Sequence, residues 1–272
     1  MHPATMLKSL KSPTLQNAVD KLLEKENYSS EEITWLRQIS PRVHKNESGY
    51  VTDGGEHYLK VGLSAMKCIQ QVIASSGLTS PSSILDFPCG YGRVMRFLKA
   101  AFPHAQIEGA DLDKKANRFC SRIFKAKTMT SRPDFDELEL NCRHDLIWCG
   151  SLITHLDKGG IASLLHFFFR HLNPGGTCVF TSHGIRVENL LTRGEINYSL
   201  TPDLVEKLLQ GYRESGAAFS EYNKSKEGYG ISLTSDAVIR KLAAEAGDWS
   251  CVGFEPAGWD NHQDVYAFRR DS

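Results

Sequence analysis

A glycine-containing turn that follows a short apolar run gives the clearest indication of a binding site in this sequence. Residues 83–93 read SILDFPCGYGR, so the run ends in Asp86 and is followed by Gly90 and Gly92. Neither glycine carries a Cβ, which lets the backbone bend sharply and approach a ligand closely. Apolar side chains recur at helical spacing over residues 94–102, until a proline stops them. A buried strand, a Gly-x-Gly turn and a helix N-terminus predict a site for a nucleoside-bearing cofactor.

A second acid falls where such a cofactor presents its ribose. Residues 106–110 read QIEGA and are followed by Asp111, whose carboxylate can accept two hydrogen bonds from a ribose diol. Asp113 is better explained as the N-cap of the next helix, although it is the alternative ribose ligand. Position 95 is Met, where a dinucleotide fingerprint requires a third glycine. NAD and FAD are therefore disfavoured as cofactors. A dehydrogenase, which would share this fold, remains an alternative function.

Three histidines near predicted strand ends could move protons. His183 follows the predicted strand 177–181 and is the first candidate for a general base, because an imidazole has a pKa near neutrality. His155 is the second candidate, and its structural alternative is a hydrogen bond to a loop carbonyl. His262 and Asp260 form either an acceptor-binding pair or an ordinary polar turn.

Several motifs in one order resemble the class I S-adenosylmethionine-dependent methyltransferases. The turn at 86–92 resembles their first motif, Gln106 to Asp113 their second strand and acid, and 144–156 their fourth strand and the loop after it. Leu-Asn-Pro-Gly-Gly at 172–176 resembles the turn into their fifth strand. The resemblance covers about residues 57–269. Pro88 departs from it, because many members carry glycine there and proline removes a backbone donor.

The resemblance implies S-adenosylmethionine as the cofactor and S-adenosylhomocysteine as its product. The adenine acid is ambiguous, because Asp134 and Asp136 compete for that role. The sulfonium already carries an activated methyl group, so the protein mainly holds the acceptor in line with it. The cofactor-binding residues that the resemblance implies are Asp86, Phe87, Pro88, Gly90, Gly92, Arg93, Asp111, Leu112, Asp134, Phe135, Gly150, Ser151 and Tyr58.

Aromatic and polar residues at the predicted pocket edge are the candidates for binding the acceptor. Tyr50, His57 and Tyr58 could close over the methionine end of the cofactor, or they could pack beside an amphipathic helix. Trp259 could stack on an acceptor or seal the edge of the sheet. The candidate substrate-binding residues are Tyr50, His57, Trp259, Asp260 and His262.

The elements that position these residues alternate between strand and helix from 83 to 183, which predicts a parallel sheet with right-handed crossovers. The expected fold is α/β and doubly wound, and the resemblance implies seven strands with the last one antiparallel. Residues 1–56 form a helical N-terminal extension, and residues 57–272 form the methyltransferase domain. Within it, 184–230 is an insertion that either caps the substrate site or joins two subunits in a homodimer.

Composition excludes several classes of function. The 272 residues contain 32 Lys plus Arg and 32 Asp plus Glu, a balance that argues against a broad nucleic-acid-binding face. The seven cysteines include no Cys-x-x-Cys pair, so packing in a reducing compartment is favoured over disulfides, and no metal site is expected. No apolar stretch reaches the roughly 18 residues that span a bilayer. The expectation is a cytoplasmic protein with no membrane partner.

The function predicted from these features is methyl transfer to a small-molecule acceptor, at a hydroxyl oxygen. The balanced charge, the insertion and the enclosing N-terminal segment favour a small acceptor, while the choice of oxygen rests on the histidines alone. Two alternatives remain open. One is methylation of a macromolecule such as a protein or surface glycan, and the other is a non-catalytic protein that binds S-adenosylmethionine.

Overall fold

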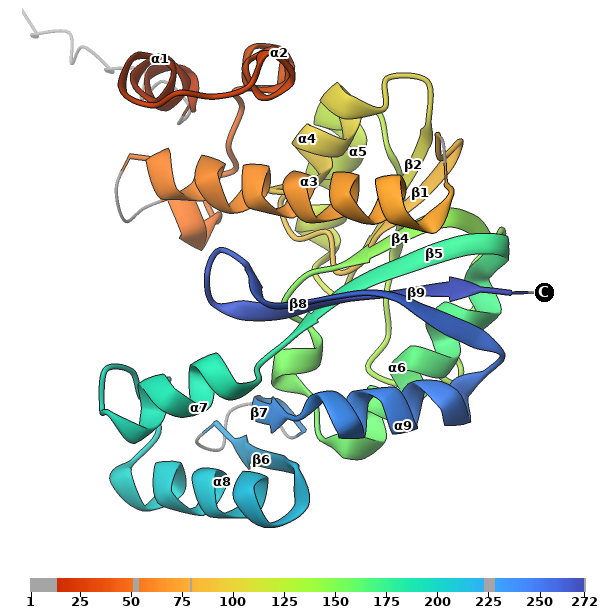
Figure 1. The fold of residues 1–272 in the computed structure, drawn as a ribbon. Coiled ribbons are helices and arrows are strands. Elements are labelled where there is room, and N and C mark those ends of the chain that lie inside the picture. The colour runs from red at the N-terminus through yellow and green to blue at the C-terminus, as the bar shows by residue number, and fades with distance from the viewer. Residues whose placement is uncertain (1–13, 51–53, 79, 223–227, 272) are drawn as a thin grey trace, which may run out of the picture.

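The computed structural model describes residues 14–50, 54–78, 80–222 and 228–271, and its centre is a seven-stranded sheet with the order β3-β2-β1-β4-β5-β9-β8 (Figure 1). β1 to β5 are parallel, and β9 runs antiparallel to both of its neighbours. This confirms the predicted α/β fold with an antiparallel last strand. The strands are β1 (Ser83–Asp86), β2 (Gln106–Asp111), β3 (Lys127–Thr130), β4 (His144–Cys149), β5 (Leu172–Ser182), β8 (Trp249–Trp259) and β9 (Gln263–Arg270).

Helices cover both faces of the sheet, and each face has its own apolar core. α3, α4 and α5 lie on one face, with α1 and α2 beyond them as an outer layer, whereas α6 and α9 lie on the other (Figure 1). Almost every strand residue of β1, β4 and β5 is buried, as expected for strands covered on both sides. These helices are α1 (Gln16–Lys25), α2 (Ser30–Gln38), α3 (Glu56–Ser76), α4 (Met95–Ala101), α5 (Lys114–Phe124), α6 (Lys158–His171) and α9 (Asp236–Ala246), and a 3₁₀ turn, η1 (Ser48–Tyr50), precedes α3.

Sequence signals at the helix ends agree with the structure. α2 begins with the capping box of Ser29 and Glu32, in which each side chain accepts a hydrogen bond from the other residue's backbone. α3 ends at Gly77, which adopts the left-handed conformation (φ 76°). α9 is capped by Ser235, whose hydroxyl accepts from the backbone N–H of Val238.

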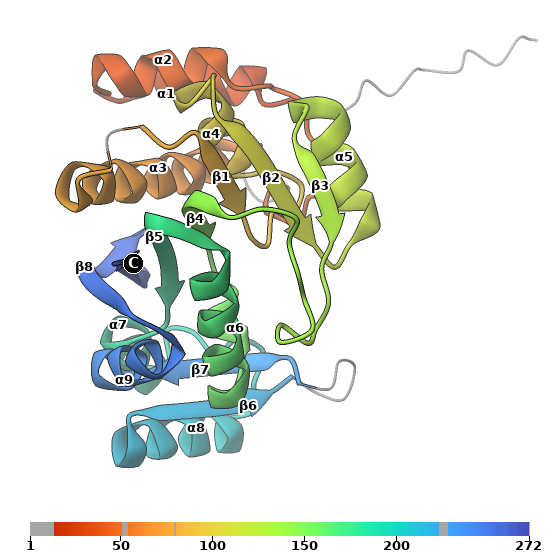
Figure 2. The same cartoon turned by 90° about the vertical axis from the view of Figure 1, so that its right-hand side faces the viewer.

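The segment 184–234 forms a lobe of its own beside the sheet. It contains α7 (Ile185–Thr192), α8 (Pro202–Ser215) and a hairpin of β6 (Ala217–Glu221) and β7 (Gly230–Thr234). A separate apolar cluster that includes Val187, Leu208 and Ile231 holds it together. Figure 2 shows the lobe on the side toward which the arrow of β5 points. We call this segment the insertion lobe.

Two expectations about the elements were wrong. The strand–helix alternation fails at 131–143, between β3 and β4, because this polar segment with its proline and aspartates forms no helix. β5 begins at Leu172, directly after α6, and not at Thr177, so the Pro-Gly-Gly sequence lies inside the strand. β8 continues to Trp259, which leaves a turn of only Asp260 to His262 before β9.

The division of the chain at residue 57 stays a prediction. Residues 1–13 of the N-terminal extension and 223–227 of the insertion lie outside the described residues. α1 and α2 share the apolar core of α3 and α4, so within the described part the extension packs on the domain. No described helix has both the length and the apolar character needed to cross a membrane.

Candidate functional site

The turn after β1 depends on its two glycines for different reasons. Gly90 and Gly92 both have positive φ, 48° and 80°. A Cβ on Gly92 would lie 2.2 Å from the ring of Phe124, whereas a Cβ on Gly90 would meet no atom within 4 Å. Gly92 therefore permits close packing of α5 on the turn. Gly90 leaves open the space that a ligand can occupy.

A cavity of about 310 Å³ opens at this turn, at the carboxyl edge of β1 and β4. Seven of the predicted site residues line it, and they come from the β1 turn, from the loop after β4 and from β8. Six further lining residues were not predicted, and they are Asn46, Glu47, Cys89, Tyr91, Val94 and Trp148. The predicted residues that the cavity brings together are Asp86, Pro88, Gly90, Arg93, Gly150, Ser151 and Trp259.

Asp86 is a buried carboxylate at the wall of this cavity. The residue is 2 % exposed, and its Oδ2 atom has no hydrogen-bond partner among the described residues. Burial, followed by the nearby charge of Asp111, raises the pKa of Asp86 well above its usual value. An unpartnered buried carboxylate at a cavity wall suits a ligand that brings a positive charge, such as the ammonium group of an amino acid.

Asp111 ties the β1 turn to the end of β2. Its two carboxylate oxygens accept from the backbone N–H groups of Gly90 (2.9 Å) and Asp113 (2.8 Å). Each oxygen keeps a lone pair for a further donor, which is what a ribose diol would supply. Asp113 caps α5, as predicted, by accepting from the backbone N–H of Lys115 at 2.7 Å. Leu112, next to Asp111, is exposed and offers an apolar surface beside the turn.

A charged network closes the N-terminal segment over the cavity. Glu47 lies 3.8 Å from the guanidinium of Arg93 and accepts a hydrogen bond from the hydroxyl of Tyr58. Arg96 is buried and donates to the Tyr58 hydroxyl and to the carbonyl of Arg42. Tyr58 is thus a packing residue behind the cavity, not a lining one. Nothing in the polar sequence 42–56 distinguished Glu47 from its neighbours, so sequence reasoning missed it.

Seven of the predicted cofactor residues do not line the cavity, and they are Tyr58, Phe87, Gly92, Asp111, Leu112, Asp134 and Phe135. Phe87 and Phe135 are buried together on the opposite face of the sheet, with ring centroids 6.0 Å apart. Asp134 is exposed and accepts from the backbone N–H groups of Asp136 and Glu137 in its own turn. The competition between Asp134 and Asp136 for an adenine contact therefore stays unresolved.

The hairpin of β8 and β9 forms the other side of the cavity. Trp259 is nearly buried, donates from Nε1 to the carbonyl of Val61 and contacts Trp148 edge to face. It seals the sheet edge and lines the cavity at the same time. Its neighbour Asp260 pairs with His57, with Nε2 and Oδ2 at 3.4 Å. Tyr50 donates to the carbonyl of Thr14 and does not line the cavity.

The end of the hairpin is connected to the cavity wall by hydrogen bonds. The amide of Gln263 donates to the hydroxyl of Ser151 at 3.0 Å, and its carbonyl accepts from Thr181 at 2.6 Å. Thr181 in turn accepts from the backbone N–H of Ser151 at 2.8 Å. Ser151 adopts positive φ (61°), which places it at a sharp bend after β4.

Two histidines and a tyrosine gather beyond this network, where the insertion lobe meets the hairpin. The hydroxyl of Tyr198 lies 2.7 Å from Nε2 of His262 and 3.3 Å from Nε2 of His183. Burial, and then the nearby His262 and His155, lowers the pKa of His183 to about 3. Burial also lowers the pKa of His262, while Asp260 opposes that shift. Tyr198 was not predicted, and its positive φ of 50° is unusual for an aromatic residue.

His155 lies in a separate aromatic group at the base of the insertion lobe. Its Nδ1–H donates to the carbonyl of Gly230 at 2.8 Å, and its ring stacks on Tyr229 with centroids 4.6 Å apart. Burial lowers its pKa. This geometry fits the structural alternative, a histidine bonded to a loop carbonyl.

One family of known proteins matches the part of the chain that contains the turn after β1. Residues 84–176 match a family model described as a methyltransferase domain. No curated protein matches the sequence. The matched segment runs from β1 to β5 and contains the glycine turn, Asp111 and the loop after β4.

Solved structures share the fold at low sequence identity. The chain is similar to an S-adenosylmethionine-dependent methyltransferase from Clostridium acetobutylicum (TM-score 0.54, 15% identity, covering 77% of this chain and 92% of that one). It is also similar to the PH0226 protein from Pyrococcus horikoshii (TM-score 0.56, 14% identity, covering 82% of this chain and 99% of that one). A third similar structure is PKMT2 from Rickettsia typhi, solved in complex with AdoHcy (TM-score 0.51, 12% identity, covering 77% of this chain and 54% of that one).

Proposed function

We propose that this chain, which belongs to the class I S-adenosylmethionine-dependent methyltransferases, methylates a small-molecule acceptor at a hydroxyl oxygen. S-adenosylmethionine is the cofactor, and it supplies a methyl group already activated by the sulfonium. The observation that carries the proposal is the cavity at the β1 turn, which has the Tyr198, His183 and His262 group beyond its hairpin wall.

The residues around the cavity suit the parts of this cofactor. Asp86 would accept from the ammonium group of its methionine end, because the carboxylate is buried and one oxygen has no described partner. Arg93 would take the carboxylate of the same end. Asp111 would hold the ribose diol, and the exposed Leu112 would cover adenine. These roles rest on position and chemistry, and Gly90 leaves the space that the ligand needs.

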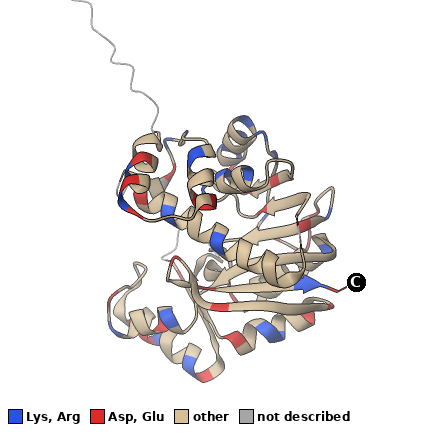
Figure 3. Cartoon of the chain, turned by 45° about the horizontal axis from the view of Figure 1, so that its top comes forward, with Lys and Arg blue, Asp and Glu red and all other residues tan. Residues whose placement is uncertain are grey.

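A small acceptor is supported by the contact of the insertion lobe with the loop after β4. The insertion lobe packs on the loop after β4, through the His155 to Gly230 hydrogen bond and the bond from the Ser232 hydroxyl to the Ile153 carbonyl. In this proposal the lobe caps the acceptor and is not a homodimer contact. Figure 3 shows basic and acidic residues interspersed along the elements, without one dominant sign. The seven free cysteines support action in the reducing cytoplasm.

Of the two histidines that contact Tyr198, His262 is the better general base. A base works best when its pKa lies near the operating pH. The pKa of His183, at about 3, makes it a weak base that would orient Tyr198 instead. His262 is only half buried, and Asp260 partly offsets the effect of burial on its pKa. The preference for His183 that sequence alone suggested stays a prediction.

Methyl transfer to a panel of hydroxylated metabolites tests the proposal, with S-adenosylhomocysteine formation as the readout. For an acceptor that turns over, His262→Gln should reduce kcat by about 100-fold or more, and His183→Gln by about tenfold or less. Cofactor affinity should be unchanged in both variants. A larger loss in His183→Gln would return the base to His183. Full activity in both would remove a histidine base from the mechanism.

A basic groove favours a second candidate, an anionic macromolecule as the acceptor. The groove has a volume of about 840 Å³, lies between residues 42–45 and α5, and no described acidic residue lines it. An acidic glycan or peptide would match its charge. Binding of a sulfated oligosaccharide, lost at high salt, would support this candidate. Its basic lining residues are Arg42, His44, Lys45, Lys115, Arg118 and Arg122.

A further inference from the structure

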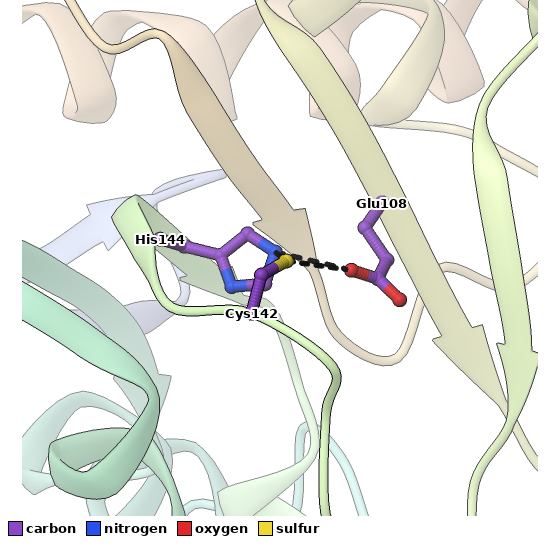
Figure 4. A group of neighbouring side chains, drawn as sticks. All are labelled: Glu108, Cys142 and His144. Atoms are coloured by element: carbon purple, nitrogen blue, oxygen red, sulfur yellow. Dashed lines mark hydrogen bonds and ion pairs between the residues drawn. The ribbon is translucent and has the colours of Figure 1, made fainter.

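A cluster of three potential metal ligands lies away from the turn after β1, toward the amino-terminal end of β4. Glu108 comes from the middle of β2, His144 is the first residue of β4, and Cys142 ends the helix-free segment between β3 and β4. Figure 4 shows the three side chains pointing toward one another. β1 separates β2 from β4 in the sheet, so Glu108 and His144 reach across one strand to meet.

The distances between the three donor atoms match the edges of a tetrahedron around zinc. Nε2 of His144 lies 3.3 Å from Oε2 of Glu108, and Sγ of Cys142 lies 3.5 Å from the same oxygen and 3.7 Å from Nε2. Zinc bonds of about 2.0 Å to oxygen and nitrogen and about 2.3 Å to sulfur give edges of roughly 3.3 Å and 3.6 Å at tetrahedral angles. An ion can therefore bind all three atoms with little movement of the side chains.

The backbone of β4 directs the His144 side chain toward Glu108 and Cys142. The register of β4 against β5 shifts between His144 and Leu146, and such irregularities redirect side chains. The His144 side chain is 1 % exposed, and its Nδ1 atom has no hydrogen-bond partner among the described residues. Nothing described on that side fixes the tautomer, so Nε2 can be the unprotonated nitrogen that a metal requires.

The charges and the ligand types select zinc among common divalent ions. A thiolate, a carboxylate and a neutral imidazole balance the two charges of the ion, which suits a site with one fully buried ligand, His144. Sulfur and nitrogen donors disfavour magnesium and calcium, which prefer oxygen ligands alone. Cys142 is exposed and lines a surface depression, so the fourth position faces water. Binding would displace the thiol proton of Cys142 into solvent.

We propose that Glu108, Cys142 and His144 form a zinc-binding site with a water molecule as the fourth ligand. The ion would fasten the segment 131–143 to the sheet, in a place where the crossover has no helix to pack. That segment carries Asp134 and Phe135, so the ion would stabilise the loop that contains these two residues. The role is structural, and it does not depend on the identity of the methyl acceptor.

Metal content and cobalt substitution test the proposal on the tag-free, full-length protein. Purified chain dialysed against zinc should retain about one ion, measured by elemental analysis, and should melt at a higher temperature than the chelator-treated chain. Replacing zinc with cobalt(II) should produce thiolate-to-cobalt absorption together with the intense visible bands of a tetrahedral site.

The matched variants are Cys142→Ser and Cys251→Ser, which each remove one free cysteine that is not fully buried. Cys142→Ser should weaken zinc binding more than about 100-fold and abolish the thiolate-to-cobalt band, whereas Cys251→Ser should keep both. Glu108→Gln, which keeps the size and shape of the side chain, should weaken zinc binding. Absence of bound zinc in the wild type, or equal zinc affinity and an equal cobalt spectrum in Cys142→Ser, would overturn the proposal and leave an ordinary His144–Glu108 ion pair.

Discussion

Two carboxylates at the cofactor turn have different surroundings and therefore different chemistry. Asp86 is buried, its Oδ2 lacks a described partner, and its pKa is raised, first by burial and then by Asp111. Asp111 is partly exposed, and backbone N–H groups satisfy both of its oxygens. A cationic ligand would favour the ionised form of Asp86. Both acids could be identified from sequence as strand-terminal residues, but the unusual titration of Asp86 required knowledge of its burial.

Cofactor binding should be coupled to release of a proton from Asp86. The pKa of this carboxyl is raised in the free protein, and the ammonium and sulfonium charges would lower it on binding. Binding should therefore strengthen as the pH rises. Titration calorimetry in buffers of different ionisation enthalpy measures the released protons. Asp86→Asn should weaken binding and remove this proton release, and an unchanged release in Asp86→Asn would assign it to another group.

The burial of His183 should make folding stability depend on pH. Its pKa falls from 6.5 to about 3 on folding, so the unfolded chain binds more protons between these values. Its neutral form contributes fully above pH 6.5, and stability is lost as the pH falls toward 3, by at most about 1.4 kcal/mol per pH unit. Urea unfolding from pH 7 to 5 should show a shallower decline for His183→Gln than for the wild type.

An exposed histidine provides the comparison for this stability test. His104→Gln should retain the wild-type dependence of unfolding free energy on pH, because His104 lies on the surface. Equal slopes in the wild type and in His183→Gln would mean that His183 is not buried as a neutral ring.

At the level of elements, the site is an assembly of strand ends. The turn after β1, the loop after β4 and the hairpin of β8 and β9 each supply part of the cavity wall. The parallel order of β1 and β4 brings two of these segments together, and the antiparallel β9 returns the third to the same edge. Gly92 and Gly150 are closely packed in these segments, because a Cβ on either would lie within 3.0 Å of a neighbouring aromatic ring.

Gly92→Ala should destabilise the protein more than Gly175→Ala. Both glycines have nearly the same positive φ, 80° and 76°, so the backbone strain is comparable. Only at Gly92 would the new Cβ also collide with a neighbour, the ring of Phe124 at 2.2 Å. The free energy of unfolding in urea should differ between the variants by about 1–3 kcal/mol. Equal stabilities would mean that α5 moves freely to admit a methyl group.

Most of the sheet could be predicted from sequence because its signals are local. The apolar run that ends in Asp86 marked one strand, the resemblance of residues 106–113 to a known motif marked another, and the capping box at Ser29 marked a helix. The contribution of the N-terminal segment was missed, because Glu47 meets Arg93 only after 46 residues of chain fold back. Tyr198 was missed for a similar reason. Its partner His183 directly follows β5 and its partner His262 lies in the β8–β9 turn, and no local pattern encodes that contact.

At the scale of the whole molecule, two additions to the sheet enclose one edge. The N-terminal segment contributes Glu47 to the cavity wall, and the insertion lobe packs on the loop after β4. The first addition shares the core of α3, whereas the second has its own apolar cluster. The proposed function assigns the first to holding the cofactor and the second to capping the acceptor.

Calorimetric titration of the full-length chain with S-adenosylmethionine tests the central claim most directly, with NAD as the competing ligand. The account predicts saturable binding of about one S-adenosylmethionine per chain, weakened by a few kcal/mol at most in Asp111→Ala, and no binding of NAD. The contrary result would be saturable binding of NAD by a chain that does not bind S-adenosylmethionine.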